Sequence, residues 1–102
     1  MVYNFRVHSE ANKEFYKGMD WYEEHSLELR SQFYLDVTNT FQRIIVNPFS
    51  FPEYERNYRK ALLSVFPYNV IFKIRDKTIS VHSVLHHSRS NKKVLKRRFR
   101  IK

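Results

Sequence analysis

The chain is 102 residues long, has no cysteine and carries a formal net charge of +9. This length supports one domain with one core, and the absence of cysteine excludes disulfides, thiolate catalysis and cysteine-ligated zinc. The apolar fraction of 42%, with nine Phe and seven Tyr, excludes a wholly disordered chain. No long apolar stretch is present, so we expect neither a signal peptide nor a membrane span, but a soluble cytoplasmic protein.

The first predicted elements are a strand and an amphipathic helix. Apolar and polar residues alternate over Val2–His8, the period of a half-buried strand. Ser9 is the predicted N-cap of the helix, and Glu10 places a negative charge in its first turn. Gly18, the only glycine, costs about 1 kcal/mol in a helix relative to Ala, so we expect a second helix to pack closely against it. The apolar face of this helix holds Ala11, Phe15, Met19 and Tyr22.

A second helix follows after a short break at His25 and Ser26. Ser26 is its predicted N-cap, and Asn47 with Pro48 ends it. Two amphipathic helices joined by so short a break form an antiparallel hairpin, and their apolar stripes need a common surface to cover. Asp36 lies outside the stripe of the second helix, which consists of Leu29, Phe33, Val37, Phe41, Ile44 and Ile45.

Three short strands supply that surface. They are predicted over Tyr58–Val65, Tyr68–Arg75 and Thr78–His86, after a proline-punctuated segment to which we assign no strand. Asp76 and Lys77 form a tight turn, so the last two runs pair as an antiparallel hairpin. The predicted fold class is α+β in the order β-α-α-β-β-β, with a two-helix hairpin packed on one face of a small, mainly antiparallel sheet and a basic C-terminal tail.

The C-terminal tail holds most of the net charge. His86–Lys102 contains eight Lys or Arg and no acid, whereas Met1–Leu85 contains eleven basic and ten acidic residues. We expect residues 1–102 to form a single domain. Its tail, over about residues 89–102, can be flexible when no partner is bound. The asymmetry points to a polyanionic partner (RNA, DNA, an acidic protein segment or an anionic membrane) or else to a merely solvated tail. The candidate partner-binding or polyanion-binding residues are Arg89, Lys92, Lys93, Lys96, Arg97, Arg98 and Arg100.

Several stretches follow one another in a characteristic order. After the N-terminal strand come AxxEFxxxxxWYEEHS, SQFYLDVTNTFQRIIVNPFSFP, RKALLSVFPYNVIFKI and ISVHSVLHHSR. The most specific parts are RIIVNPFSFP, and FPYNVIF followed by VLHHSR. In these stretches the chain resembles the RelE/ParE superfamily of bacterial toxins from type II toxin–antitoxin modules. The resemblance covers nearly the whole chain and is closer to ParE than to RelE.

The resemblance implies a compact fold in which two helices cover one face of a small sheet and leave the other face open. It implies a cognate antitoxin as a partner, and antitoxins of this superfamily are often acidic where they bind. RelE-like members cut messenger RNA in the ribosome, whereas ParE-like members poison DNA gyrase and need no catalytic residues of their own. We expect no cofactor, no metal and no membrane partner.

The choice between these two activities depends on whether the chain holds a nuclease set. Metal-independent RNA cleavage needs a base for the 2′-hydroxyl, cations near the phosphate and an acid for the leaving oxygen. By resemblance, such a set lies on the exposed sheet face and near the end of the last strand. Asn69 and Ser88 stand where RelE-like enzymes often place Arg and Tyr, so the set looks incomplete. The catalytic candidates, if the chain is RelE-like, are Arg59 with its neighbour Lys60, Arg75, His87 with its neighbour His86, and Arg89.

Three functions of different classes therefore compete. First is a toxin that acts on gyrase by protein contact, second a ribosome-dependent endoribonuclease, and third a nontoxic nucleic-acid-binding module. His82 and His86 do not form a shared metal site, because four positions along a regular strand place them about 13 Å apart. Trp21 is either a contact residue for gyrase or antitoxin or, together with Tyr22, part of the interface between the two helices, and we favour the second interpretation.

Overall fold

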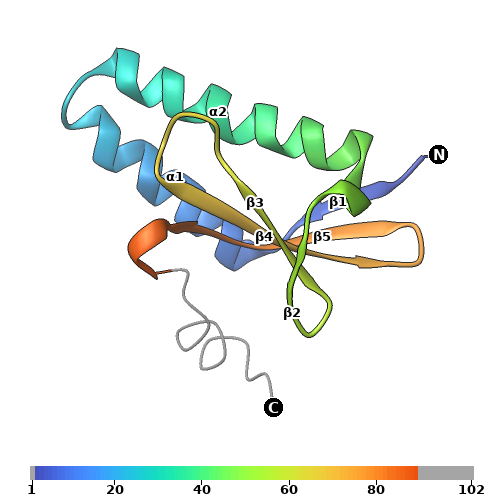
Figure 1. Cartoon of the computed structure of the whole chain (residues 1–102). Helices are drawn as coiled ribbons and strands as arrows, with labels where there is room; N and C mark the ends of the chain where they lie inside the picture. The colour runs from blue at the N-terminus through green and yellow to red at the C-terminus, as the bar shows by residue number, and fades with distance from the viewer. Residues whose placement is uncertain (1, 90–102) are drawn as a thin grey trace.

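The computed structural model describes residues 2–89, which form two α-helices, five strands and two short 3₁₀ turns. Both helices lie on the same side of the sheet (Figure 1). The predicted α+β class is therefore confirmed, with one strand more than expected. In chain order the elements are β1 (Asn4–Val7), α1 (Ser9–Glu23), α2 (Leu27–Val46), η1 (Pro48–Ser50), β2 (Glu53–Glu55), β3 (Tyr58–Leu62), β4 (Tyr68–Arg75), β5 (Thr78–His86) and η2 (His87–Arg89).

The two helix starts differ in how they are capped. Ser26 caps α2 as predicted, because its hydroxyl oxygen accepts a hydrogen bond from the Leu29 amide at 3.0 Å. The prediction that Ser9 caps α1 is wrong, since Ser9 is already helical and His8 holds the cap position without a side-chain bond. The reason is that the His8 amide donates to the carbonyl of Val81 at 2.9 Å, which keeps the chain extended one residue further.

Close contact between α1 and α2 is confirmed at Gly18. A Cβ built on this residue would lie 2.7 Å from the ring of Phe33 on α2, so only glycine fits without a shift. Tyr22 closes the same interface, with its ring centroid 5.1 Å from that of Phe33 and 4.7 Å from that of Phe66. Aromatic rings thus pack between the two helices, and they belong to the same core as the apolar side chains of the sheet.

The sheet has the strand order β1-β5-β4-β3-β2. Only β1 runs parallel to its neighbour β5, and the three other pairs are antiparallel. The predicted β4–β5 hairpin is confirmed, with Asp76 at a positive φ of 56° in its turn. The missed strand β2 pairs with β3 through a two-residue turn at Arg56 and Asn57, whose φ values of 46° and 72° are those of a type I′ hairpin.

A bulge at His82 changes which side chains of β5 face the helices. Ile71 pairs with Ser83 while Phe72 pairs with Val81, which leaves His82 as the extra residue. Regular alternation would place Ser83 and Leu85 on the same face as Val81, but the inserted residue exchanges the two faces, so they lie on the opposite face.

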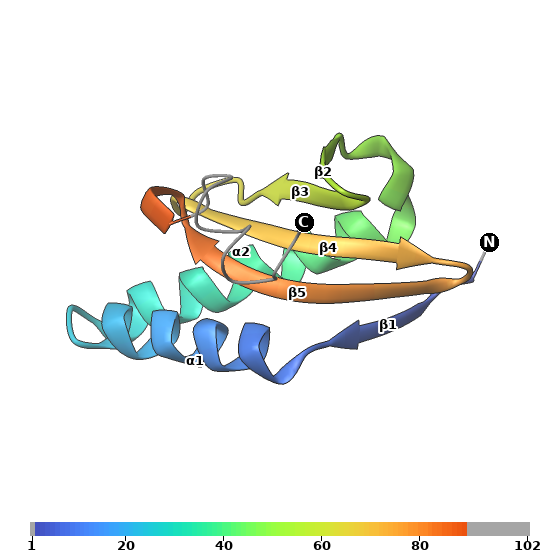
Figure 2. The same cartoon turned by 90° about the horizontal axis from the view of Figure 1, so that it is seen from below.

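Two hydrophobic clusters result. The main core lies between the helices and the sheet, and after the bulge Val84 takes the inward position on β5. The second cluster consists of Tyr58, Ile71 and Leu85, with Tyr54 packed against it. It belongs to the face of the sheet that the helices do not cover, the side toward the viewer in Figure 2.

Candidate functional site

A cluster of basic and aromatic side chains gathers on the uncovered sheet face around the bulge. The His82 ring stacks on that of His8, with centroids 4.2 Å apart, and meets the Tyr58 ring edge to face at 5.2 Å. The Lys73 ammonium lies 4.7 Å from the centre of the Tyr58 ring. His8 lies between β1 and α1, and the other three residues lie on β3, β4 and β5, so only the folded sheet brings them together. We call His8, Tyr58, Lys73 and His82 the histidine cluster.

Burial shifts two pKa values in the histidine cluster. The pKa of His82 is lowered from 6.5 to about 4, first by burial and then by the charges of His8 and Lys73. Burial also raises the pKa of the Tyr58 phenol. At neutral pH the cluster therefore presents a neutral His82 imidazole and a protonated Tyr58 phenol beside the Lys73 ammonium group. The imidazole can accept a proton next to an anion that the ammonium group binds.

A second Lys–Tyr pair lies beside this cluster. The Lys60 ammonium lies 4.4 Å from the centre of the Tyr54 ring, and Lys60 is paired with Ile71 on β4. Two ammonium groups are thus held over aromatic rings on the same face. The sequence-predicted candidate Lys60 therefore lies on the same face as the histidine cluster. Sequence analysis missed the cluster, and the Tyr and Lys residues that recur along the strands were the available signal.

Arg59 is turned toward the other face of the sheet. It pairs with Phe72, whose side chain is in the main core. Its guanidinium donates to the carbonyl oxygen of Phe51 and lies 5.1 Å from the centre of the Phe49 ring. The observed role of Arg59 is therefore to hold the segment around η1 against β3.

The remaining catalytic candidates are spread along the sheet. Arg75 pairs with Thr78 at the hairpin turn, whereas His87 follows the opposite end of β5. Nine strand residues separate these ends by roughly 27 Å. Arg89 ends η2 beside His87, and the six other basic candidates lie outside the described residues: Lys92, Lys93, Lys96, Arg97, Arg98 and Arg100. The structure thus does not gather Arg59, Arg75 and His87 into one reaction centre.

A cleft lies where α1 meets the end of β5. Trp21 lines it and is 56% exposed, so our interpretation of Trp21 as part of the helix interface is wrong, while that of Tyr22 is right. His86 also lines the cleft, with its ring 5.3 Å from that of Tyr68 and its Nδ1 3.0 Å from the Ser88 hydroxyl. The cleft encloses about 390 Å³ and offers one exposed aromatic surface.

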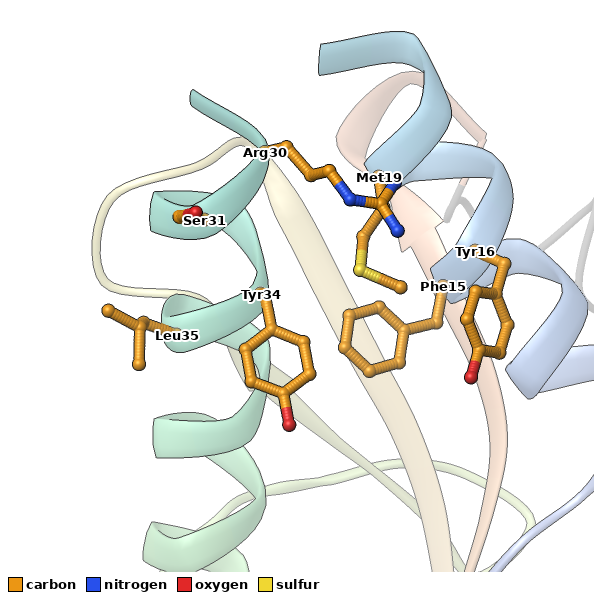
Figure 3. Close-up of a pocket in the computed structure, with 7 residues that line it drawn as sticks. All are labelled: Phe15, Tyr16, Met19, Arg30, Ser31, Tyr34 and Leu35. Carbon is orange, nitrogen blue, oxygen red and sulfur yellow. The ribbon is translucent and has the colours of Figure 1, made fainter. Parts of the chain in front are cut away.

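A second depression, which we call the hairpin groove, lies between the two helices. Figure 3 shows side chains of α1 and α2 facing each other across it. It encloses about 480 Å³. Sequence analysis missed this groove, although its exposed aromatic residues lie outside the predicted apolar stripes. Its lining consists of Phe15, Tyr16, Met19, Arg30, Ser31, Tyr34 and Leu35.

Residues 2–89 hold neither a metal-binding cluster nor a membrane-spanning helix. No group of three or more His, Asp or Glu side chains in this range is arranged to hold a metal ion. None of the helices in the described part of the chain has the length and apolar character of a membrane span.

Comparison with known proteins adds a family to this geometry. The family model described as the ParE toxin of the type II toxin–antitoxin system parDE matches residues 5–91. A solved structure of the chromosomal ParDE toxin–antitoxin system from P. aeruginosa is similar in fold, with a TM-score of 0.75. The two chains are 13% identical, and the match covers 83% of this chain and 96% of the other. No curated protein matches in sequence.

Proposed function

The chain belongs to the ParE toxin family of type II toxin–antitoxin systems, since the family model spans residues 5–91, and from this premise we propose that it inhibits bacterial growth by protein contact with DNA gyrase. A cognate antitoxin neutralises it. All 102 residues act as one toxin domain, and both partners place it in the cytoplasm.

The separation of Arg75 from His87 supports gyrase contact over RNA cleavage. General acid–base catalysis requires its groups within hydrogen-bond reach of one reacting centre. Arg75 and His87 do not meet this requirement, because they lie at opposite ends of β5. The Arg59 guanidinium is bonded to the Phe51 carbonyl and lies over the Phe49 ring. A toxin that acts by protein contact needs no such set. The basic, aromatic face of the sheet then serves as a docking surface.

The experiment is to induce the protein alone in a sensitive bacterium and to pulse-label DNA, RNA and protein synthesis over the first minutes. We expect DNA synthesis to fail first while translation continues. Purified protein should then inhibit DNA supercoiling by purified gyrase. A block of translation before DNA synthesis, with supercoiling unaffected, would rule out gyrase as the target.

One observation favours RNA cleavage as a second candidate function. The histidine cluster places neutral His82 beside Lys73 on the uncovered face, and a neutral imidazole next to a cation suits removal of a proton near a phosphate. The test is cleavage of messenger RNA in a translating extract by the wild type, by His82→Gln and by Lys73→Met. This candidate requires cleavage by the wild type and its loss in both variants.

The basic tail is proposed as a shared surface for antitoxin and target. Its residues are Arg89 and the six basic candidates outside the described residues. If the tail instead neutralised about five phosphates of nucleic acid without specificity, a fourfold rise in salt would weaken binding roughly 500-fold. A titration of duplex DNA and of single-stranded RNA at several salt concentrations separates these two interpretations.

A further inference from the structure

The uncovered face of the sheet carries positive charges in a regular arrangement. Arg6 on β1 pairs with Ser80 on β5, and Ser80 pairs with Lys73 on β4, so these three residues form one row across the sheet. Paired residues of neighbouring strands point to the same face. Lys73 lies over the ring of Tyr58, which belongs to the apolar cluster of the uncovered face, so the whole row points to that face.

Two further cations extend this row along the strands. Arg75 follows Lys73 by two positions on β4, which keeps it on the same face, about 7 Å further along. Lys60 on β3 pairs with Ile71, two positions before Lys73, so its Cα lies about 8 Å from that of Lys73. We call Arg6, Lys60, Lys73 and Arg75 the cationic array. Between Cα positions the array spans about 14 Å across the sheet and about 14 Å along it.

Acidic residues are concentrated on the other side of the molecule. Among the strand residues of the uncovered face in the described chain, Glu55 is the one acid, and it lies on the edge strand β2. Residues 9–46, which form the helical layer, hold seven of the ten acidic residues and four basic residues. This layer lies on the opposite side of the sheet from the cationic array (Figure 2). The uncovered face therefore attracts a polyanion.

The aromatic rings of this face are already covered by the protein's own side chains. Tyr58 is 8% exposed and has the Lys73 ammonium over its ring, and the Lys60 ammonium lies over the ring of Tyr54. The two imidazole rings of the histidine cluster stack on each other. The bases of a single strand bind by stacking on free aromatic rings. The face therefore suits a ligand that presents phosphates rather than bases.

The composition of the face also favours phosphates over a protein surface. The centres of protein interfaces are enriched in aromatic side chains and depleted of lysine. Here the apolar residues Ile71 and Leu85 are buried, and the cations stand around them. Duplex DNA carries phosphates on two strands, across grooves about 6 Å and about 12 Å wide. Cations spread in two directions can meet both of these strands, whereas a single extended chain would need only one row.

We propose that the cationic array binds the phosphate backbone of duplex DNA, namely the DNA segment that gyrase holds. The inference rests on the proposed contact with gyrase and deepens it, because it names the part of the gyrase–DNA complex that the uncovered face meets. Phosphate contacts orient a protein on the duplex without reading its base sequence. Binding through the array therefore depends strongly on salt concentration and little on sequence.

The test measures the affinity of the full chain for a short fluorescent DNA duplex by anisotropy, between about 50 and 200 mM salt. The double variant Lys60→Gln, Lys73→Gln removes two cations of the array. The slope of log K against log salt should become shallower by about two, and the affinity near 0.1 M salt should fall at least about tenfold. The matched control, Lys13→Gln with Lys17→Gln, removes the same charge from exposed positions on α1 and should change affinity less than about threefold.

Three results with DNA alone would overturn the proposal. The first is wild-type affinity and slope in the Lys60→Gln, Lys73→Gln variant, which would assign DNA binding to the basic tail that every variant retains. The second is an absence of duplex binding by the wild type at the lowest salt concentration. The third is tighter binding of the wild type to single-stranded DNA of the same sequence than to the duplex.

Measurements with gyrase keep this inference apart from the proposed function. The variant of the array should bind gyrase without DNA as the wild type does, and the gyrase–DNA complex at least about tenfold more weakly. An equal loss without DNA would assign the array to protein contact and overturn the inference. If the wild type does not inhibit gyrase, the proposed function fails, while the duplex titrations still decide whether the array binds DNA. Circular dichroism checks folding, and Arg6→Gln with Arg75→Gln, at two exposed positions, replaces the lysine pair if that variant is unfolded.

Discussion

The carboxylate of Asp36 on α2 accepts a hydrogen bond at 2.8 Å from the backbone amide of Phe66, thirty positions further along the chain. The same carboxylate accepts from the amides of Val65 at 2.9 Å and Ser64 at 3.2 Å. One buried side chain thus satisfies three backbone donors in the loop that joins β3 to β4. This loop leads into Tyr68, where β4 begins, so Asp36 connects the helical layer to the centre of the sheet.

Replacing Asp36 by Asn should destabilise the protein by about 3 kcal/mol. The amide oxygen can still accept from Val65 and Phe66, which share one carboxylate oxygen, but the NH₂ group then faces the amide of Ser64, so two donors meet and the charge that strengthens all three bonds is lost. For a domain of this size the loss corresponds to a fall in Tm of roughly 10–20 °C, measured by thermal denaturation. The control is Asp20→Asn, because the Asp20 side chain is 77% exposed; this change should alter Tm by little. An unchanged Tm for Asp36→Asn would show that the loop between β3 and β4 keeps its conformation without the Asp36 carboxylate.

Gly18→Ala should destabilise the fold although Ala is the better helix former. The added Cβ would lie 2.7 Å from the Phe33 ring, which is fully buried and cannot move without displacing Tyr22 and Phe66. Overpacking of about 2 kcal/mol outweighs a gain in helix propensity of about 1 kcal/mol. Urea denaturation of Gly18→Ala, Phe33→Leu and the double variant tests this explanation. Gly18→Ala should lower the free energy of unfolding less when Phe33 is already Leu than in the wild type. If the two single changes simply add up in the double variant, the steric explanation is contradicted.

The stability of the fold should fall between pH 6.5 and pH 4 through His82. Its folded-state pKa is about 4, below the ordinary value of 6.5. As the pH falls through this window the unfolded chain takes up a proton that the folded chain does not, so folding is progressively disfavoured. The loss should reach roughly 2 kcal/mol, less than the full linkage value because solvent screens a half-buried ring. The groups that face this ring are His8, which caps α1, Tyr58 of β3 and Lys73 of β4.

Urea denaturation at several pH values measures this loss for the wild type and for His82→Asn. The variant has a different stability at pH 7 because the ring contacts are lost, so the comparison is between slopes. We expect a shallower slope for His82→Asn between pH 6.5 and pH 4. Parallel slopes would mean that other groups cause the acid sensitivity.

Arg59→Ala should lower stability rather than remove a catalytic group. It deletes the bond to the Phe51 carbonyl and the contact with the Phe49 ring, together worth about 1–2 kcal/mol. Arg75→Ala, an exposed residue at the hairpin turn, should stay within about 0.5 kcal/mol of the wild type. Thermal denaturation decides between them. If Arg59→Ala melts like the wild type and yet abolishes RNA cleavage, Arg59 belongs to a nuclease site after all.

Much of the fold follows from local patterns in the sequence. The period of apolar residues predicts both helices and the strands β1, β3, β4 and β5, and the cap of α2 at Ser26 is confirmed by its bond to Leu29. The predicted close approach at Gly18 is confirmed as well. The elements and the cap depend on residues within a few positions of one another, so periodicity and capping rules are sufficient to find them, whereas the contact at Gly18 was inferred from the cost of a glycine inside a helix.

The placement of the candidate site residues depends on contacts between distant segments. One extra residue at His82 exchanges the faces of β5, and the pairing of β3 with β4 places Arg59, rather than its neighbour Lys60, on the helix side of the sheet. Burial of Asp36 depends on a loop thirty positions away. Periodicity predicts that a residue lies on one face of its own element, but not which face meets the core once a bulge intervenes.

Local patterns in the sequence were sufficient for both helices, four of the five strands, their order, the surplus of positive charge and the resemblance to a toxin family. Only the folded structure shows that Arg75 and His87 stand at opposite ends of β5 and that the His82 ring stacks on that of His8. The physical reason is that helix and strand formation are governed by neighbouring residues, whereas register, strand order and packing are settled by the burial of the whole core at once.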